Sequence, residues 1–170
     1  MTYHNPQETR TACKRGFSLI ELVIVIVIIG ILAAIAIPRM SSATAGAGNS
    51  ALSGDLAVLR NAIDLYSSEH GNTFPAVATI DAQLTQYTDV FGATSATKDA
   101  THSFGPYLRK TPALPVGPVG YKNATTYIDG SSGTAGASAG AWFYNATNGS
   151  ISANLDATQL DAAGTAYNTY

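Results

Sequence analysis

The stretch KRGFSLIELVIVIVIIGILAAIAIP, from Lys14 to Pro38, dominates this sequence. It opens on two basic residues and a glycine and continues as an aliphatic run, in which Glu21 is the only ionisable side chain between Phe17 and Ile37. As a helix, the run would span about 33 Å at 1.5 Å per residue, which is enough to cross a hydrocarbon core. Because isoleucine and valine occupy every face, the run fits lipid or a dense helix bundle better than the surface of a globular domain.

Two common targeting segments offer ordinary explanations for such a run. A secretory signal peptide has a basic start, a short apolar middle and a small-residue cleavage site. Residues 33–36 could serve as that site, but the run is too long and Glu21 interrupts its start. An uncleaved signal anchor fits the length. The positive charges that precede the run, Arg10, Lys14 and Arg15, would keep the N-terminus cytoplasmic and place the remainder outside.

Glu21 is difficult to explain by either segment. A carboxylate inside a membrane helix costs on the order of 2.5–3.5 kcal/mol, so such a residue usually has a partner and a function. The run itself offers no such partner. A cut between Gly16 and Phe17, however, would create a cationic α-amine four residues before Glu21, and the same amine on a neighbouring subunit could neutralise the carboxylate. This pairing would fix the axial register between subunits, because a shifted subunit would leave a charge in hydrocarbon.

The stretch resembles the class III leader and N-terminal helix of type IV pilins and type II secretion pseudopilins. The matching residues are Lys14 and Arg15, Gly16 at the cut, Phe17 as the new N-terminus, Glu21 as the fifth mature residue, and Pro38 at the end. The match covers only about 25 residues, but its features are specific. It implies that a prepilin peptidase removes residues 1–16, with Cys13 among them, and N-methylates Phe17. It also implies that Glu21 meets the Phe17 amine of a neighbour during filament assembly.

Gly30 and Pro38 are expected to weaken the apolar helix. Proline cannot donate a helix hydrogen bond, and glycine costs roughly 1 kcal/mol against alanine in a helix interior. We therefore expect a helix break in this interval, where the backbone would stretch when subunits pack into a filament, as in related pili. The alternative is that a membrane helix simply tolerates both residues.

The remainder predicts a small α+β head. Apolar residues at helical spacing indicate a helix with one buried face: Leu52, Leu56, Leu59, Ile63 and Tyr66. Gly71 is a suitable C-terminal stop for this helix. A short helix is expected after Thr79, and strands are expected at residues 120–128, 141–144 and 150–153, with a hairpin at Asn148-Gly149. Residues 129–140 read as a flexible loop. The resemblance implies a pilin-like fold, in which the long N-terminal helix packs on a small antiparallel sheet.

The expected organisation is a leader (1–16), a transmembrane or filament-core helix (17–38), a head (39–154) and a polar C-terminal tail (155–170). We expect the tail to be poorly ordered. Charged residues make up 12% of the chain and the net charge is −2, so no basic patch indicates nucleic acid.

Enzyme and ligand sites are poorly supported by the sequence. GASAG (136–140) has the spacing of a serine-hydrolase elbow, but it lies in a low-complexity stretch and no histidine follows it. His70 and His102 lack partners at metal-ligand spacing and read as surface residues. The resemblance raises a calcium loop at Asp129, yet only one carboxylate is present there. We therefore predict no enzyme activity, no catalytic residues, no cofactor and no metal.

These features favour a structural subunit of a type IV filament, most simply a type II secretion pseudopilin. Its partners would be the prepilin peptidase, other copies of itself, minor pilins or pseudopilins and an inner-membrane assembly platform. Before assembly the chain would cross the inner membrane once, with a periplasmic head, and it would then enter a periplasmic pseudopilus or a surface pilus. The alternatives are a type IV pilus pilin for adhesion, motility or DNA uptake, and a membrane-anchored binding module that keeps residues 1–16.

Overall fold

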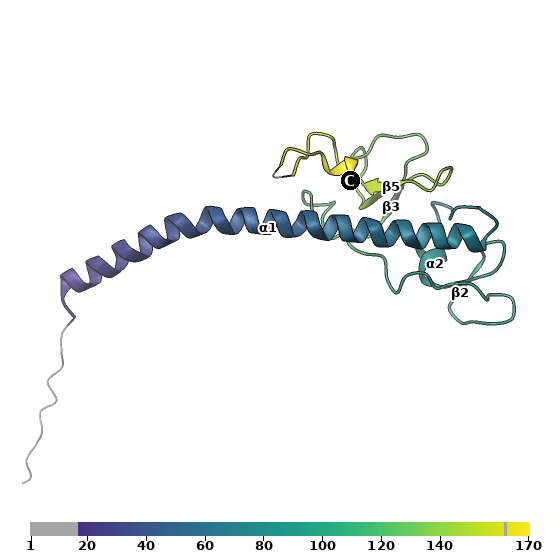
Figure 1. The fold of residues 1–170 in the computed structure, drawn as a ribbon, viewed down its shortest axis with the longest axis horizontal. Coiled ribbons are helices and arrows are strands. Elements are labelled where there is room, and N and C mark those ends of the chain that lie inside the picture. Colours follow the sequence, from purple (N-terminus) through teal and green to yellow (C-terminus); the bar gives the residue numbers. More distant parts are fainter. Residues whose placement is uncertain (1–16, 162) are drawn as a thin grey trace, which may run out of the picture. The chain divides into compact units, whose positions relative to one another are not determined.

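A computed structural model describes residues 17–161 and 163–170, without the side chains of residues 37–45. The expected leader, including Gly16 and Cys13, lies outside the described residues. The chain divides into two compact units, with the boundary after Met40. Helix α1 (Leu19–Glu69) runs through both units and is labelled in Figure 1.

The first unit contains the apolar part of α1. Leu19–Ala36 has a mean hydropathy of 3.2, none of it is buried, and it is long and apolar enough to cross a membrane. The helix is assigned without interruption through Gly30 and Pro38. The free chain therefore has no break at these two positions, and the extension of this interval inside a filament stays a prediction.

In the second unit, the C-terminal part of α1 forms one wall of the head core. The predicted apolar stripe is confirmed, because its five members are at most 2% exposed: Leu52, Leu56, Leu59, Ile63 and Tyr66. The helix ends where expected. Gly71 follows it with a φ of 62°, and the Asn72 N–H donates to the Ser67 carbonyl at 2.8 Å, which is the long bond of a Schellman-type C-cap.

A short helix and a small hairpin follow α1. Helix α2 (Ile80–Thr85) begins after Thr79 as predicted, but the Thr79 side chain makes no capping hydrogen bond. Strands β1 (Tyr87–Thr88) and β2 (Thr94–Ser95) then pair antiparallel.

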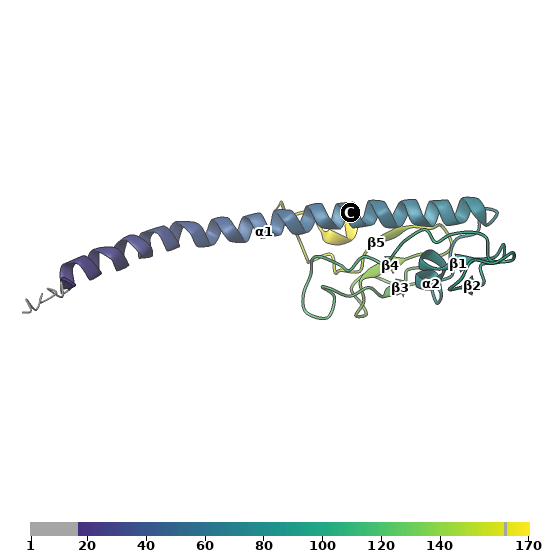
Figure 2. The same cartoon turned by 90° about the horizontal axis from the view of Figure 1, so that it is seen from below.

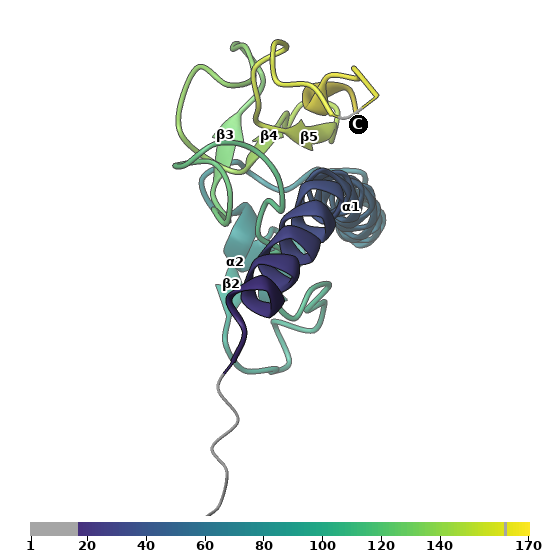
Figure 3. The same cartoon turned by 90° about the vertical axis from the view of Figure 1, so that its left-hand side faces the viewer.

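The main sheet has three strands in the order β3-β4-β5: β3 (Tyr127–Asp129), β4 (Trp142–Tyr144) and β5 (Ile151–Ala153). The predicted α+β class is confirmed. The β4–β5 pair is antiparallel, as expected for a hairpin, whereas β3 pairs with β4 in parallel. The strand expected at 120–128 begins only at Tyr127, because residues 120–123 form a turn. In Figures 2 and 3, β5 lies next to α1 and β3 lies at the far edge of the sheet.

The three aromatic residues of β4 point alternately toward and away from the core, because successive side chains of a strand lie on opposite faces of the sheet. Trp142 and Tyr144 are fully buried, while Phe143 on the opposite face is only half-buried. The indole N–H of Trp142 and the hydroxyl of Tyr144 both have hydrogen-bond partners. Trp142 Nε1 donates to the Pro112 carbonyl at 3.0 Å, and the Tyr144 hydroxyl donates to the Pro75 carbonyl at 2.9 Å. The strands and the α1 stripe belong to a single buried cluster.

The glycine- and serine-rich loop between β3 and β4 is held in place, contrary to its composition. Asn154, which is fully buried, accepts a hydrogen bond from the Gly136 N–H at 2.8 Å. It also donates to the carbonyls of Ser138 and Gly140 at 2.7 and 3.2 Å. The Tyr121 hydroxyl also donates to the Gly136 carbonyl at 2.9 Å. The expectation of a flexible loop is therefore corrected, since distant side chains supply the contacts that the loop itself lacks.

The C-terminal tail also differs from the expectation of poor order. Leu155 is fully buried, and the short 3₁₀ helix η1 (Tyr167–Thr169) contacts β5. Arg60 Nη2 of α1 donates to the Ile151 carbonyl at 3.2 Å and to the main-chain oxygen of Tyr170. The tail is thus docked on α1 and β5, because aromatic side chains within its polar sequence pack against the core.

Candidate assembly segment and head surface

The segment predicted to direct processing and assembly lies at the start of α1. Phe17 precedes the helix and is 74% exposed. The Ser18 carbonyl accepts hydrogen bonds from the Glu21 and Leu22 N–H groups at 3.1 and 3.2 Å, so Ser18 occupies the N-cap position. Gly16 lies outside the described residues, and the geometry of the proposed cut is not part of the structure.

Ser18 is a residue that the sequence reading overlooked. Its spacing to Glu21 is the S-x-x-E pattern of a capping box, in which serine begins the helix and glutamate occupies the third helical position. This pattern was visible in FSLIE. It indicates that the acid also suits the start of the helix, since a negative charge is favoured near the free N–H groups of the first turn.

Glu21 is exposed and lies in the first turn of α1, surrounded by apolar side chains. Among the side chains that the structure describes, which exclude those of residues 37–45, the single salt bridge is the one between His102 and Asp99 in the head. Glu21 therefore has no cationic partner in the described part of one chain. Leu19 and Ile20 beside it are 80% and 63% exposed, so the carboxylate belongs to a surface that would be covered by lipid or by other helices.

Gly30 and Pro38, which were expected to weaken the helix, lie further along α1. Gly30 has open space where a Cβ would be, since no heavy atom outside its neighbours and the backbone of its own helix turn lies within 4 Å. The Pro38 backbone is helical, and its side chain lies outside the description. The structure thus places Phe17 and Glu21 near the start of α1, and Gly30 and Pro38 further along the same helix.

His70 corrects another expectation, because it is buried and not a surface residue. It is 5% exposed and stacks on the Tyr66 ring, with ring centroids 3.8 Å apart. Its Nδ1 lies 2.8 Å from the Tyr66 carbonyl, and its Nε2 lies 2.8 Å from the Asp89 carbonyl. The ring therefore connects the end of α1 to the loop between β1 and β2. His102 remains half-exposed and contacts Asp99.

The described residues form neither the serine-hydrolase site nor the metal sites that were considered from the sequence. GASAG lies in the loop that leads into β4, and the carbonyl of its serine accepts a hydrogen bond from Asn154. The Asp129 carboxylate accepts a hydrogen bond from the Ser131 N–H at 2.8 Å. In the part of the chain that the structure covers, no three His, Cys, Asp or Glu side chains are grouped as metal ligands.

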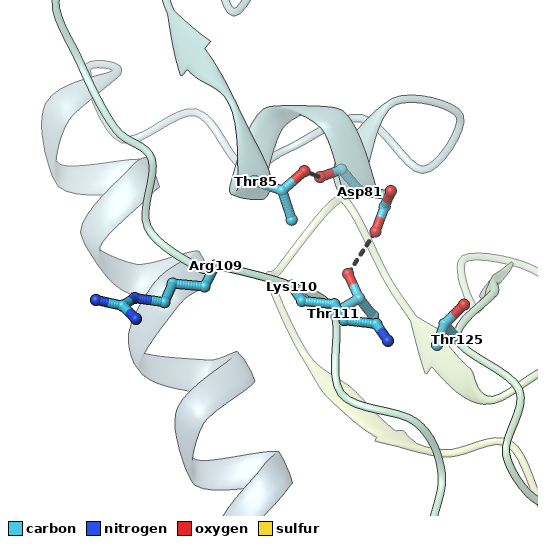
Figure 4. Close-up of a pocket in the computed structure, with 6 residues that line it drawn as sticks. All are labelled: Asp81, Thr85, Arg109, Lys110, Thr111 and Thr125. Carbon is cyan, nitrogen blue, oxygen red and sulfur yellow. Dashed lines mark hydrogen bonds between the residues drawn. The ribbon is translucent and has the colours of Figure 1, made fainter. Parts of the chain in front are cut away.

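The head surface carries a groove between α2 and β3. It has a volume of about 400 Å³ and is lined by Val77, Ala78, Ile80, Asp81, Thr125, Thr126 and Tyr127. A smaller hollow of about 230 Å³ shares Asp81 and Thr125 with it and is flanked by Arg109 and Lys110. Figure 4 shows this hollow, in which the Thr111 hydroxyl points to the Asp81 carboxylate. The groove is lined about equally by polar and apolar surface, and the adjoining hollow carries the side chains of Arg109 and Lys110 beside Asp81.

Known proteins resemble both the N-terminal segment and part of the head. Residues 11–37 match the family described as the prokaryotic N-terminal methylation motif. The type II secretion system core protein G of Aeromonas hydrophila is 30% identical over 105 residues, which cover 61% of this chain and 68% of that protein. The corresponding core protein G of Escherichia coli (strain K12) is 37% identical over 57 residues, or 34% of this chain and 39% of that protein.

A pilin is among the relatives as well. The type IV major alpha-pilin of Moraxella bovis is 49% identical over 51 residues, which cover 30% of this chain and 32% of that protein. No solved structure matches the chain. The methylation motif implies processing by a prepilin peptidase, and the relatives are filament subunits, not enzymes, that assemble with copies of themselves. This chain belongs to the type IV pilin and type II secretion pseudopilin family.

Proposed function

We propose that this chain is a pseudopilin of a type II secretion system, which assembles into a periplasmic pseudopilus that serves protein secretion. The supporting observation is how far the similarity extends. The match to the Aeromonas hydrophila protein spans 105 residues, more than the 51 residues of α1, so it must include part of the head. The Moraxella bovis match spans 51 residues and could lie within the N-terminal segment alone.

In this proposal the precursor is cut between Gly16 and Phe17, and the new amine is methylated and remains cationic. Phe17 precedes the N-cap and Glu21 is exposed on the first helical turn, so both groups are accessible to a neighbouring helix. Pairing of the two would remove the cost of placing an isolated carboxylate among apolar side chains, on the order of 2.5–3.5 kcal/mol. The pair would also select one axial register, because any other register leaves both charges unpaired.

The apolar segment of α1 fits a single membrane-spanning anchor. We propose that its N-terminus faces the cytoplasm and its head the periplasm, because the basic residues precede the run. Before assembly the segment would be covered by lipid, and after assembly by neighbouring helices. Minor pseudopilins and an inner-membrane assembly platform would be its further partners.

Mass spectrometry of the mature protein tests the processing step. The chain should begin at methylated Phe17, because the motif places the cut directly before it. A mature protein that retains Met1 would contradict the proposal and favour a membrane-anchored binding module instead. Unmethylated Phe17 would retain cleavage but refute methylation.

A type IV pilus pilin is the second candidate, and the 49% identity to the Moraxella bovis pilin favours it. Deletion of the gene in its host distinguishes the two functions. Loss of secreted proteins from the medium, with surface filaments retained and secretion restored by the intact gene, would support the pseudopilin. Loss of surface filaments with normal secretion would refute it in favour of the pilin.

A further inference from the structure

The loop between β1 and β2 displays an aromatic side chain to solvent. Phe91 is 91% exposed and its neighbour Val90 is 57% exposed. The loop is nevertheless well ordered, because the Asp89 carboxylate accepts hydrogen bonds from the Phe91 N–H at 2.9 Å and the Ala93 N–H at 2.8 Å. The backbone that carries Phe91 is thus fixed, although the ring itself contacts little of its own chain.

Contacts from two other elements hold the same loop. Gln83 of α2 donates to the Gly92 carbonyl at 2.9 Å, and His70 at the end of α1 lies 2.8 Å from the Asp89 carbonyl. Gly92 has a φ of 84°, and a Cβ there would lie 2.4 Å from the Tyr66 hydroxyl. Only glycine therefore fits this turn. The exposure of Phe91 follows from the architecture of the head and does not result from a loose loop.

The groove described above offers a complementary surface on another side of the head. Its apolar lining comes from Val77, Ile80 and Tyr127, and its volume of about 400 Å³ is large enough for an aromatic ring. Asp81, which lines the groove, and Gln83, which holds the loop, are two positions apart, or about 200° around the axis of α2. Figures 2 and 3 agree that α2 lies between β3 and the β1–β2 pair. The loop of one chain therefore cannot fill its own groove.

We propose that Phe91 of one copy inserts into the groove between α2 and β3 of the next copy. The inference rests on the proposed filament and names a head contact within it. Charge complementarity supports a second copy as the occupant, because Asp89 accompanies the ring while the two cations of the adjoining hollow, Arg109 and Lys110, outnumber the one acid, Asp81. Since the two surfaces differ, the contact is heterologous and repeats from copy to copy without closing.

The contact is weak when taken alone. An aromatic side chain buries about 150–250 Å², whereas stable interfaces bury about 1,200–2,000 Å² in total. Phe91 therefore acts only among copies that the membrane or the filament core has already concentrated. Its role would be to select the rotational setting of neighbouring heads, complementing the axial register set at the start of α1.

Cysteine cross-linking in assembled filaments tests the contact. Residues 17–170 contain no cysteine, so a Cys13→Ser background removes the remaining thiol. Phe91→Cys combined with Ala78→Cys at the exposed rim of the groove should yield, on oxidation, a ladder of dimers, trimers and larger species. A disulfide requires Cα atoms within about 7 Å, so random encounters form few such bonds. Val119→Cys with Ala78→Cys is the matched control, because Val119 is also fully exposed, at 101%.

Three other cross-linking results would overturn the inference. Monomers alone would mean that the surfaces do not meet, and dimers alone would mean that the contact closes on itself. Equal ladders from the Val119 control would mean that the linkage is nonspecific.

A substitution separates this inference from the proposed filament. Phe91→Ser should lower the filament yield by about tenfold, since loss of a buried aromatic contact weakens each addition. Val119→Ser should leave the yield unchanged, and both variants should be processed normally and reach wild-type abundance. Wild-type yield from Phe91→Ser would refute the head contact while leaving the filament proposal intact. Absence of processing or of filaments in the wild-type chain would instead refute the proposed function.

Discussion

Replacement of Asn154 by alanine should destabilise the head more than any exposed polar substitution. The amide is fully buried and makes three hydrogen bonds, to the Gly136 N–H and to the carbonyls of Ser138 and Gly140. Alanine removes all three and leaves the partners without a substitute. Because these partners lie in the loop that joins β3 to β4, the loss should loosen the whole crossover.

The magnitude follows from the hydrogen bonds. Each buried hydrogen bond contributes about 0.5–1.5 kcal/mol net, and an orphaned partner adds to the loss. The three together predict a decrease of about 2–4 kcal/mol in the free energy of unfolding. This is a large part of the 5–15 kcal/mol that is typical of a small domain.

Urea unfolding of the full chain in detergent provides the assay. The chain has a single tryptophan, Trp142, which is fully buried in β4 and pairs with Ala153 of β5. Its fluorescence therefore reports unfolding of the sheet next to Asn154. With a slope of about 2 kcal/mol per M, the midpoint should fall by about 1–2 M. Asn61→Ala, at an exposed position on α1, is the control and should change the free energy by less than about 0.5 kcal/mol.

Equal midpoints for Asn154→Ala and Asn61→Ala would refute the reasoning. That result would mean that the loop keeps its conformation without the amide, or that water replaces all three contacts at no cost. A lower slope with an unchanged midpoint would indicate a change in the unfolded state and would count against the argument as well.

Three further outcomes are expected. Gly149→Ala should destabilise the head by about 1–3 kcal/mol in the same urea assay, because Gly149 has a φ of 72° and a Cβ would lie 2.4 Å from the Phe74 ring; a neutral effect would contradict the close approach. Burial, aided by the charge of Asp81, raises the pKa of the Tyr127 hydroxyl to about 12, although a bond to a neighbouring threonine opposes the shift. Protonated Tyr127 should contribute fully to the free energy of unfolding below pH 10, and this contribution should be lost as pH rises toward 12. Tyr127→Phe should lessen that loss, and an unchanged alkaline profile of the unfolding free energy would contradict the assignment. Glu21→Ala should lower the yield of sedimentable filaments by about tenfold or more while the head unfolds at the wild-type midpoint, and wild-type yield would refute the pairing.

Local patterns in the sequence predicted the parts of the fold that depend on neighbouring residues. The stripe from Leu52 to Tyr66 followed from helical spacing, and the stop at Gly71 followed from its tolerance of positive φ. The hairpin at Asn148-Gly149 followed from turn chemistry, and β4 and β5 flank it as expected. In each case the signal and the structure lie within a few residues of each other.

The features that were missed depend on contacts between distant residues. The parallel pairing of β3 requires a partner across a long crossover, and nothing in the local sequence encodes that direction. Residues 129–140 have a flexible composition, but Asn154 supplies their order from outside the loop. The tail is polar on average, yet Leu155 and Tyr170 dock on the core and on Arg60.

The assembly segment could be proposed from the sequence because its chemistry lies in a short motif, with Phe17 and Glu21 four residues apart, and the roles of both residues stay a prediction. Ser18 could also have been identified from the spacing of a capping box. The groove and the loop around Phe91 could not, because their residues meet only after α2, β3 and the β1–β2 hairpin have packed.

The order in which the chain supplies its core has a consequence for export. The stripe on α1 is synthesised early, but the strands that cover it come last, and Arg60 reaches Ile151 across 91 positions. If the head is exported as proposed above, the stripe has no partner in its own chain until those strands have crossed the membrane, and it stays accessible to chaperones and proteases. In the proposed orientation, the head would therefore fold late, after its N-terminal helix has entered the bilayer. A chain arrested before β4 would be delivered with its helix bare, and quality control could recognise that helix directly.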